Sequence, residues 1–284
     1  MVTSLIQTKT IDMNVLSLFD GMSCGQIALE RAGIEVDNYF ASEIDKYAIE
    51  VTKNNFPNTK HIGSVVDVKG SDLPKIDLLI GGSPCQSFSS FGNGSGLDGK
   101  SGLFWEFARI LKEIKPKYFL LENVNMKKEW QDIITNELGV KPIPFNSNLL
   151  SAQNRDRLYW SNITFELPKD KGVKYSDVLY DLPFREIKPF MFKKWGDKMR
   201  IDKGVNWVCN EKANCLTTKN CHTNQYLLNK DKSLMRLMNA KEFERLQTVP
   251  ENYTDYVSNT ERFRMLGNGW TVDVITHIFK NIKQ

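Results

Sequence analysis

Long apolar runs, paired cysteines and a secretory leader are all missing from this 284-residue chain. No hydrophobic stretch reaches the length of a membrane span, and residues 1–13 lack the apolar core of a signal peptide, so no membrane partner is expected. The five cysteines have no paired spacing, which argues against a disulfide framework and for a reducing, cytoplasmic compartment. Cys215, Cys221 and His222 match no zinc-ligand spacing, so no metal is expected either.

The charge is divided unevenly along the chain. Residues 1–150 carry a net charge of −3, whereas residues 151–284 carry +7. A basic half beside an acidic half favours a polyanionic partner such as nucleic acid, although a solvated lysine-rich face explains the pattern equally well. Hydrophobic residues make up 41% of the chain, enough for one large domain or a large domain with a small lobe.

Strand-like and helical segments alternate over the first half of the chain. We expect strands at 15–19, 39–42, 61–66, 76–80 and 117–121, and helices at 26–32, 45–55, 103–114 and 128–138. This alternation predicts an α/β fold with a doubly wound, mostly parallel sheet. We expect domains at 13–164 (catalytic and cofactor-binding), 165–235 (a small irregular lobe) and 236–284 (a return to the first domain). The last part should hold a helix at 240–248 and a strand followed by a helix over 265–282.

A cysteine and a glutamate each follow one of these apolar runs. Cys85 comes after the run 76–80, and Glu122 comes directly after Tyr118 to Leu121. Open α/β sheets build their sites at strand ends, and a thiol with a nearby acid can add to a ring while protonating it. Taken alone, Cys85 is better interpreted as a packed small hydrophobe, but its surroundings favour a nucleophile.

Polar anchors for a small molecule follow the first three expected strands. The segment Phe19-Asp20-Gly21-Met22-Ser23-Cys24-Gly25 joins a strand to a helix whose N-terminus can face a ligand, but it lacks the third glycine of the dinucleotide pattern. Glu43 can accept hydrogen bonds from ribose hydroxyls, and Asp67 can bind an exocyclic amine. Either acid could cap a helix instead, but three consecutive anchors favour a cofactor that carries a nucleoside.

Two further segments carry side chains suited to a site. In Gln153-Asn154-Arg155-Asp156-Arg157 an extended backbone would place both arginines on one face, where they could hold a carboxylate, a phosphate or a carbonyl oxygen. An exposed strand with solvated charges is the alternative. Gly267-Asn268-Gly269-Trp270 predicts a compact turn whose indole could close over a flat ring.

Together and in this order, these segments resemble the C5-cytosine DNA methyltransferases over about residues 13–282. The resemblance rests on Pro84-Cys85-Gln86, Glu122-Asn123-Val124, Gln153-x-Arg155-x-Arg157, the stretch 236–250, and Gly267-Asn268-Gly269-Trp270-x-Val272. It implies a class I methyltransferase (Rossmann-like) fold in a bare catalytic core with a short target-recognition lobe. That lobe, with its Thr217-Thr218 pair, looks most like the de novo branch and its bacterial and phage relatives.

The resemblance also implies S-adenosylmethionine as methyl donor and double-stranded DNA as substrate. Cys85 would add to C6 of a flipped-out cytosine, Glu122 would protonate N3, and Arg157 would hold O2. Arg155 would orient the acid or a phosphate. The residues that would surround the cofactor are Phe19, Asp20, Gly21 and Gly25 at the methionine part, Glu43 and Ile44 at the ribose, Asp67 and Val68 at the adenine, and Pro84, Leu103, Asn268, Gly269 and Trp270 around the rest.

Some features depart from the family or stay open. Where Asn268 and Gly269 stand, members vary between Asn and Arg and usually carry Ser, which would reshape the pocket. The glycine-rich segment 87–101 is expected to order over DNA as a lid. An RNA (tRNA) methyltransferase is the alternative, but that branch carries a Cys-Phe-Thr signature absent here, and a non-catalytic accessory protein would lack the motifs present. The target sequence, the base-reading residues within 190–230, the oligomeric state and a restriction endonuclease partner are left open.

Overall fold

The computed structural model describes residues 13–84, 102–186, 206–207, 210–218, 226–231 and 233–283. Its elements, in chain order, are β1 (Asn14–Leu18), α1 (Cys24–Ala32), β2 (Asn38–Ser42), α2 (Lys46–Asn55), β3 (Lys60–Gly63), η1 (Val65–Asp67), η2 (Gly70–Asp72), β4 (Leu78–Gly82), α3 (Leu103–Ile114), β5 (Tyr118–Val124), α4 (Lys128–Leu138), β6 (Ile143–Asn146), η4 (Ser147–Leu149), β7 (Asp156–Ser161), η5 (Tyr175–Val178), β8 (Arg185–Glu186), β9 (Asn206–Trp207), β10 (Tyr226–Leu228), β11 (Leu234–Leu237), α8 (Ala240–Leu246), α9 (Asn259–Asn268) and α10 (Val272–Phe279).

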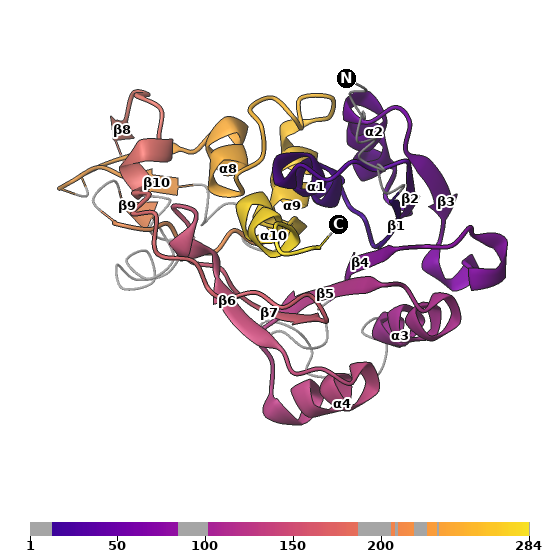
Figure 1. Cartoon of the computed structure of the whole chain (residues 1–284). Helices are drawn as coiled ribbons and strands as arrows, with labels where there is room; N and C mark the ends of the chain where they lie inside the picture. The colour runs from indigo at the N-terminus through magenta and orange to yellow at the C-terminus, as the bar shows by residue number, and fades with distance from the viewer. Residues whose placement is uncertain are drawn as a thin grey trace, which may run out of the picture.

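Seven strands form the main sheet in the order β3-β2-β1-β4-β5-β7-β6 (Figure 1). Strands β1 to β5 run parallel, whereas β7 is antiparallel to both of its neighbours. The predicted doubly wound, mostly parallel α/β sheet is therefore confirmed. The strand order reverses between β1 and β4, and a crevice at such a switch point is where open α/β sheets bind ligands.

Helices cover both faces of this sheet. Helices α1, α2, α8, α9 and α10 pack on one face, and α3 and α4 pack on the other (Figure 1). Strand β1 shows why, because Val15 points into the first core cluster and Leu16 into the second. Alternating side chains that are apolar on both faces are typical of a buried parallel strand.

The first helix ends at the predicted residue but begins at Cys24, two residues before the predicted start, and the second helix runs over Lys46–Asn55 after its cap Asp45. Gly33 follows α1 with φ +72°, a left-handed conformation that glycine adopts without strain, and its N–H bonds back to Glu30 O. Asp45 caps α2, since its side chain accepts a hydrogen bond of 3.0 Å from Tyr47 N. Asp45 follows the carboxyl end of β2 and lines the crevice there, whereas Gly33 lies at the opposite edge of the sheet, where the chain enters β2.

Strands within and just after the expected lobe 165–235 form a second, smaller sheet with the order β8-β11-β10-β9. A buried ion pair joins this sheet to α8: Arg236 Nη2 of β11 lies 2.6 Å from Glu242 Oε1. The same carboxylate accepts the backbone N–H of Tyr180 at 2.8 Å. Part of the stretch 236–250 therefore serves to attach the lobe to the main body.

Two sequence predictions about secondary structure are wrong. The third strand ends at Gly63 instead of continuing to residue 66, because Gly63 turns with φ +79° and the chain enters η1; Asp67 lies in that 3₁₀ turn, not at a strand end. The strand expected after residue 265 is helical: α9 runs through Gly267 and Asn268. Met265, Leu266 and Gly267 are buried within α9, and tertiary packing overrides local propensity there. The helix expected after that strand is present as α10.

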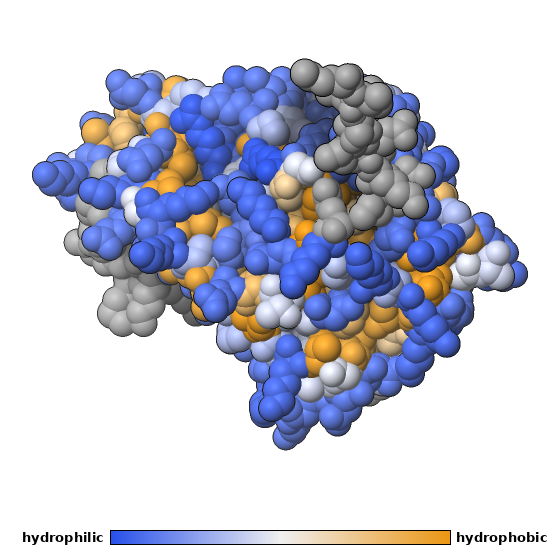
Figure 2. All heavy atoms as spheres, viewed as in Figure 1, coloured by the Kyte–Doolittle hydropathy of each residue, from blue (hydrophilic) through white to orange (hydrophobic). Residues whose placement is uncertain are grey.

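Hydrophilic residues predominate on the face shown in Figure 2, and hydrophobic residues reach that surface in separate areas. Among the residues that the structure describes, no helix combines the length and apolarity needed to cross a membrane.

Candidate active site

A cavity of about 460 Å³ opens at the carboxyl ends of the parallel strands. Most of the predicted site residues line it: Phe19, Asp20, Gly21, Glu43, Ile44, Pro84, Leu103, Glu122, Arg155, Arg157, Asn268, Gly269 and Trp270. Four carboxylate residues line the cavity, Asp20, Glu43, Asp45 and Glu122, and among them Glu43 and Glu122 come from different strand ends. Cys85, which follows Pro84 in the chain, lies outside the described residues, as does the proposed lid 87–101.

Backbone groups hold the Glu43 carboxylate at one end of the cavity. Oε2 accepts the N–H of Gly21 at 2.7 Å, and Oε1 accepts the N–H groups of Ile44 at 2.7 Å and Asp45 at 2.9 Å. These bonds join the loop after β1 to the loop after β2. Beside this carboxylate, Ile44 exposes 76% of its surface at the cavity, an apolar platform next to an acid.

The loop after β1 turns sharply around Asp20. Phe19, Gly21 and Ser23 all have φ between +58° and +59°, which is strained for the two that are not glycine. Asp20 secures this loop by accepting hydrogen bonds from Ser23 Oγ and, at 2.7 Å, from Tyr39 Oη. Burial raises the pKa of Asp20 to about 6, although hydrogen bonds from Ser23, Ser17 and Tyr39 oppose the shift.

Three predicted cofactor residues do not line the cavity. A Cβ at Gly25 would lie 2.5 Å from Ile80 Cδ1 and 2.9 Å from Tyr39 Oη, so this glycine allows α1 to pack closely on the sheet. Asp67 and Val68 lie beyond the end of β3, and Ser64 and Val65 line the cavity instead. The early end of β3 accounts for that shift.

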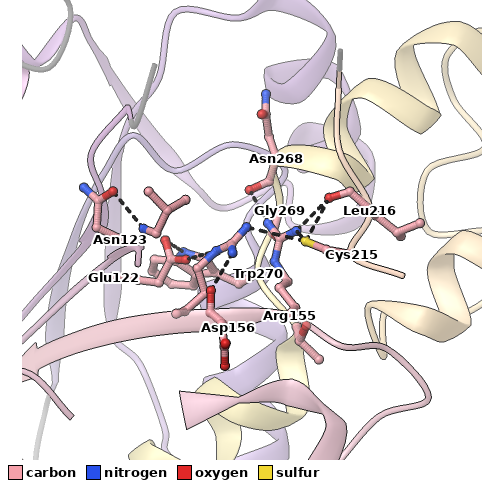
Figure 3. Close-up of polar contacts among 12 residues, drawn as sticks. Glu122, Asn123, Arg155, Asp156, Cys215, Leu216, Asn268, Gly269 and Trp270 are labelled. Atoms are coloured by element: carbon pink, nitrogen blue, oxygen red, sulfur yellow. Dashed lines mark hydrogen bonds and ion pairs between the residues drawn. The ribbon is translucent and has the colours of Figure 1, made fainter. Parts of the chain in front are cut away.

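Side chains from distant segments hold the second carboxylate, Glu122 of β5. Its Oε1 lies 2.9 Å from Arg157 Nε of the neighbouring strand β7, and its Oε2 accepts a hydrogen bond of 3.2 Å from Trp270 Nε1 (Figure 3). The Glu122 side chain is only 11% exposed, so the acid is partly desolvated. Gly82 leaves room for this contact, because a Cβ there would lie 2.9 Å from Trp270 Nε1.

Arg155 does not contact Glu122 but binds backbone carbonyls. Its Nη1 donates to Leu216 O at 3.0 Å, and its Nη2 donates to Gly269 O at 2.9 Å and Gly267 O at 3.2 Å (Figure 3). The guanidinium is buried, and burial lowers the pKa of Arg155. The structure therefore gives the expected contact with the acid to Arg157, while Arg155 fastens the lobe segment to the turn that carries Trp270.

A close approach of backbones supports that attachment. A Cβ at Gly267 would lie 2.8 Å from the carbonyl carbon of Thr217 and 3.0 Å from Thr218 N. The backbone of the Thr217-Thr218 pair therefore lies against Gly267, near the end of α9 and just before the turn that carries Trp270. Only glycine fits at position 267.

Sequence reasoning gave no role to three residues that shape this site. Asn123 Nδ2 donates to Ser83 Oγ at 3.0 Å and Ser83 O at 3.3 Å, which holds the chain two residues before Cys85. Cys215 Sγ lies 3.5 Å from Arg155 Nη1 and 4.0 Å from Arg157 Nη2. Gln153, which the arginine motif contains, accepts Leu216 N at 2.8 Å and donates to Gln247. Asn123 and Gln153 could have been found from the sequence, because both belong to motifs named above, whereas no motif contains Cys215.

Comparison with known proteins places this arrangement among enzymes that modify DNA. A family model described as C-5 cytosine-specific DNA methylase matches residues 13–164 and 162–284. The type II methyltransferase M1.ScrFI of Lactococcus lactis subsp. cremoris is 30% identical over 94% of this chain and 77% of its own length. The type II methyltransferase M.HhaI of Haemophilus parahaemolyticus is 25% identical over 95% of this chain and 94% of its own.

Solved structures share the fold at lower identity. The Dnmt2 methyltransferase of S. pombe superposes with a TM-score of 0.71 over 93% of this chain and 96% of its own, at 20% identity. That likeness concerns the fold alone.

Proposed function

The chain belongs to the C-5 cytosine-specific DNA methylase family, and from that premise we propose a role for each residue around the cavity. It is a DNA (cytosine-5-)-methyltransferase that takes the methyl group from S-adenosylmethionine. The contact that carries the proposal is the Glu122–Arg157 ion pair, because it sets an acid and a carbonyl-binding cation side by side in the cavity that also holds Glu43.

The Glu43 end of the cavity fits S-adenosylmethionine, which supplies an electrophilic methyl group when bound. Glu43 would accept ribose hydroxyls, since its backbone bonds fix both carboxylate oxygens at the cavity wall. Ile44 and Val65 would provide apolar surface for the adenine ring. The methionine part would lie along the loop after β1 and the turn at Asn268 and Gly269.

The Glu122 end would receive the cytosine after it leaves the duplex, because C5 is not accessible within the base stack. Cys85 would form an Sγ–C6 bond while Glu122 supplies a proton to N3, so negative charge does not accumulate on the ring. The nucleophilic C5 would then take the methyl group, with S-adenosylhomocysteine as the leaving group. Loss of the C5 proton to solvent, return of the N3 proton to Glu122 and breakage of the Sγ–C6 bond would release 5-methylcytosine and the Cys85 thiolate.

Arg157 would bind the cytosine O2 while it keeps Glu122 in place. A guanidinium carries five N–H donors in a planar fork, so one side chain can serve a carboxylate and a carbonyl oxygen together. Arg155 would act at a distance, by holding the Gly267–Gly269 carbonyls and hence Trp270 against Glu122.

The domain boundaries are part of the proposal. Residues 13–164 and 236–284 would form the catalytic body, which the packing of α10 against α1 supports. Residues 165–235 would form the lobe that reads the target, and its short second sheet supports a separate unit.

A restriction endonuclease that cuts the same target, and a cytoplasmic location, are proposed as well. The type II names of M1.ScrFI and M.HhaI support the partner, and their bacterial sources support the location. Resistance of DNA methylated by this protein to one endonuclease encoded beside it would test the partnership.

The decisive test uses labelled S-adenosylmethionine with mixed-sequence duplex DNA, RNA in parallel, and mass analysis of the product nucleoside. We expect 5-methyl-deoxycytidine from the wild-type chain and none from Cys85→Ser. Label found only in RNA would favour the RNA-directed alternative. DNA binding without any labelling would favour an accessory protein.

A further inference from the structure

An ion pair joins two walls of the cavity that lie far apart in sequence. Arg264 Nη2 of α9 is 2.5 Å from Asp45 Oδ2, the residue that caps α2. Both side chains line the cavity, and α2 and α9 both lie on the α1 face of the sheet (Figure 1). None of the motifs described above includes either residue.

The residues next to Asp45 and next to Arg264 indicate a function for this ion pair. Asp45 follows Glu43 and Ile44, and its own N–H bonds to the Glu43 carboxylate at 2.9 Å. Arg264 lies one helical turn before Asn268, so the two share a face of α9. The pair therefore connects the proposed ribose wall to the turn proposed to hold the methionine part.

The charges favour a lasting contact of modest strength. Burial lowers the pKa of Arg264, but hydrogen bonds with Glu261 and Asp45 outweigh it and raise the pKa overall, so the guanidinium stays cationic. The side chains are 35% and 26% exposed, which leaves the pair open to screening by salt. A pair of this kind can hold two walls together without fixing them permanently.

We propose that the Asp45–Arg264 pair is a strap across the cofactor end of the cavity that slows the release of S-adenosylmethionine. This role rests on the proposed cofactor site at Glu43. Both residues act as positioning residues, because they keep the walls on either side of the cofactor together and need not touch the reacting methyl group.

The test is a double-mutant cycle read out as the cofactor dissociation rate in stopped-flow fluorescence, without DNA. Asp45→Asn keeps a good helix cap while it removes the charge, and Arg264→Gln removes the other charge. We expect each single variant and the double variant to release S-adenosylmethionine about two- to five-fold faster than wild type, all three alike. Added salt should narrow the difference between wild type and the variants.

Glu261→Gln is the matched control, because Glu261 bonds to the same guanidinium from within α9 at 2.5 Å and leaves the crossing contact intact. It should release the cofactor at the wild-type rate. Unchanged rates in Asp45→Asn and Arg264→Gln, or losses that add in the double variant, would overturn the strap alone. A wild-type chain that binds no S-adenosylmethionine would overturn the proposed cofactor site and the strap together.

Discussion

Glu43 and Glu122 line the same cavity at the ends of parallel strands, yet the chain holds them in different ways. The Glu43 carboxylate is fixed by backbone N–H groups of Gly21, Ile44 and Asp45, all within 22 residues. Glu122 is fixed by side chains of Arg157 and of Trp270, the latter 148 residues away. One end of the site is thus built locally, and the other exists only once the whole chain has folded.

The largest effect is expected from a substitution of Glu122, at the end of the cavity that side chains from distant segments form. Glu122→Gln keeps the size of the side chain but removes the proton donor, so single-turnover methyl transfer should fall about 10²- to 10⁴-fold. Binding of S-adenosylmethionine should stay at the wild-type level, since Glu122 is proposed to contact the cytosine and not the cofactor. Glu113→Gln removes a surface carboxylate on α3 and should leave the rate unchanged; an equal loss in both variants would contradict the role of Glu122.

The second prediction concerns Arg155, whose hydrogen bonds are proposed to hold Trp270 against Glu122. Arg155→Met removes the hydrogen bonds that the guanidinium donates to the carbonyls of Leu216, Gly267 and Gly269, of which Gly269 O keeps a bond from Gln247 Nε2. The free energy of unfolding should fall by about 3 kcal/mol in urea titrations. Arg31→Met, whose side chain is 34% exposed beside Asp273, should cost less than about 1 kcal/mol. A similar loss in the two variants would show that Arg155 is not the attachment inferred here.

The third prediction is a pH dependence of the stability, which arises from Asp20 in the loop at the Glu43 end of the cavity. Burial raises the pKa of Asp20 from 3.8 to about 6. Between pH 3.8 and about 6, the Asp20 carboxyl is therefore mostly protonated in the folded chain and mostly ionised in the unfolded chain. Stability contributed by the protonated form is therefore present at low pH and is lost as pH rises from about 4 to 6, by about 2–3 kcal/mol. Asp20→Asn should remove this slope from chemical denaturation curves measured across that range, and an unchanged slope would assign it to another group.

The smallest expected effect concerns Glu43 itself. Glu43→Gln replaces one of two acceptor oxygens by an amide NH₂, which opposes the N–H groups that the carboxylate now accepts. The affinity for S-adenosylmethionine should fall about ten-fold in calorimetry, whereas DNA binding should not change. Glu50→Gln on the exposed face of α2 should bind the cofactor as wild type does, and a loss there would indicate an effect of helix charge alone.

The contrast between the locally built Glu43 end and the Glu122 end, which distant segments form, also explains which features the sequence predicted and which it did not. The alternation of strand-like and helical segments predicted the doubly wound sheet, and the position of Glu43 and Glu122 after apolar strands predicted that both would face one crevice. The early end of β3 at Gly63 and the helical course of residues 265–268 depend on packing that local patterns do not contain. The division of labour between Arg155 and Arg157 could not be predicted either, because the carbonyls that bind Arg155 come from residues 216 and 267–269.

The backbone contact between Gly267 and the Thr217-Thr218 pair bears on how a chain of this design acquires a new target. Grafting a lobe from a relative would succeed only if both junctions spare Thr217 and Thr218, since their backbone lies against Gly267 with no room for a Cβ. An exchanged lobe would therefore have to keep the fit of Thr217 and Thr218 to Gly267 as well as the buried Arg236–Glu242 ion pair that joins the second sheet to α8.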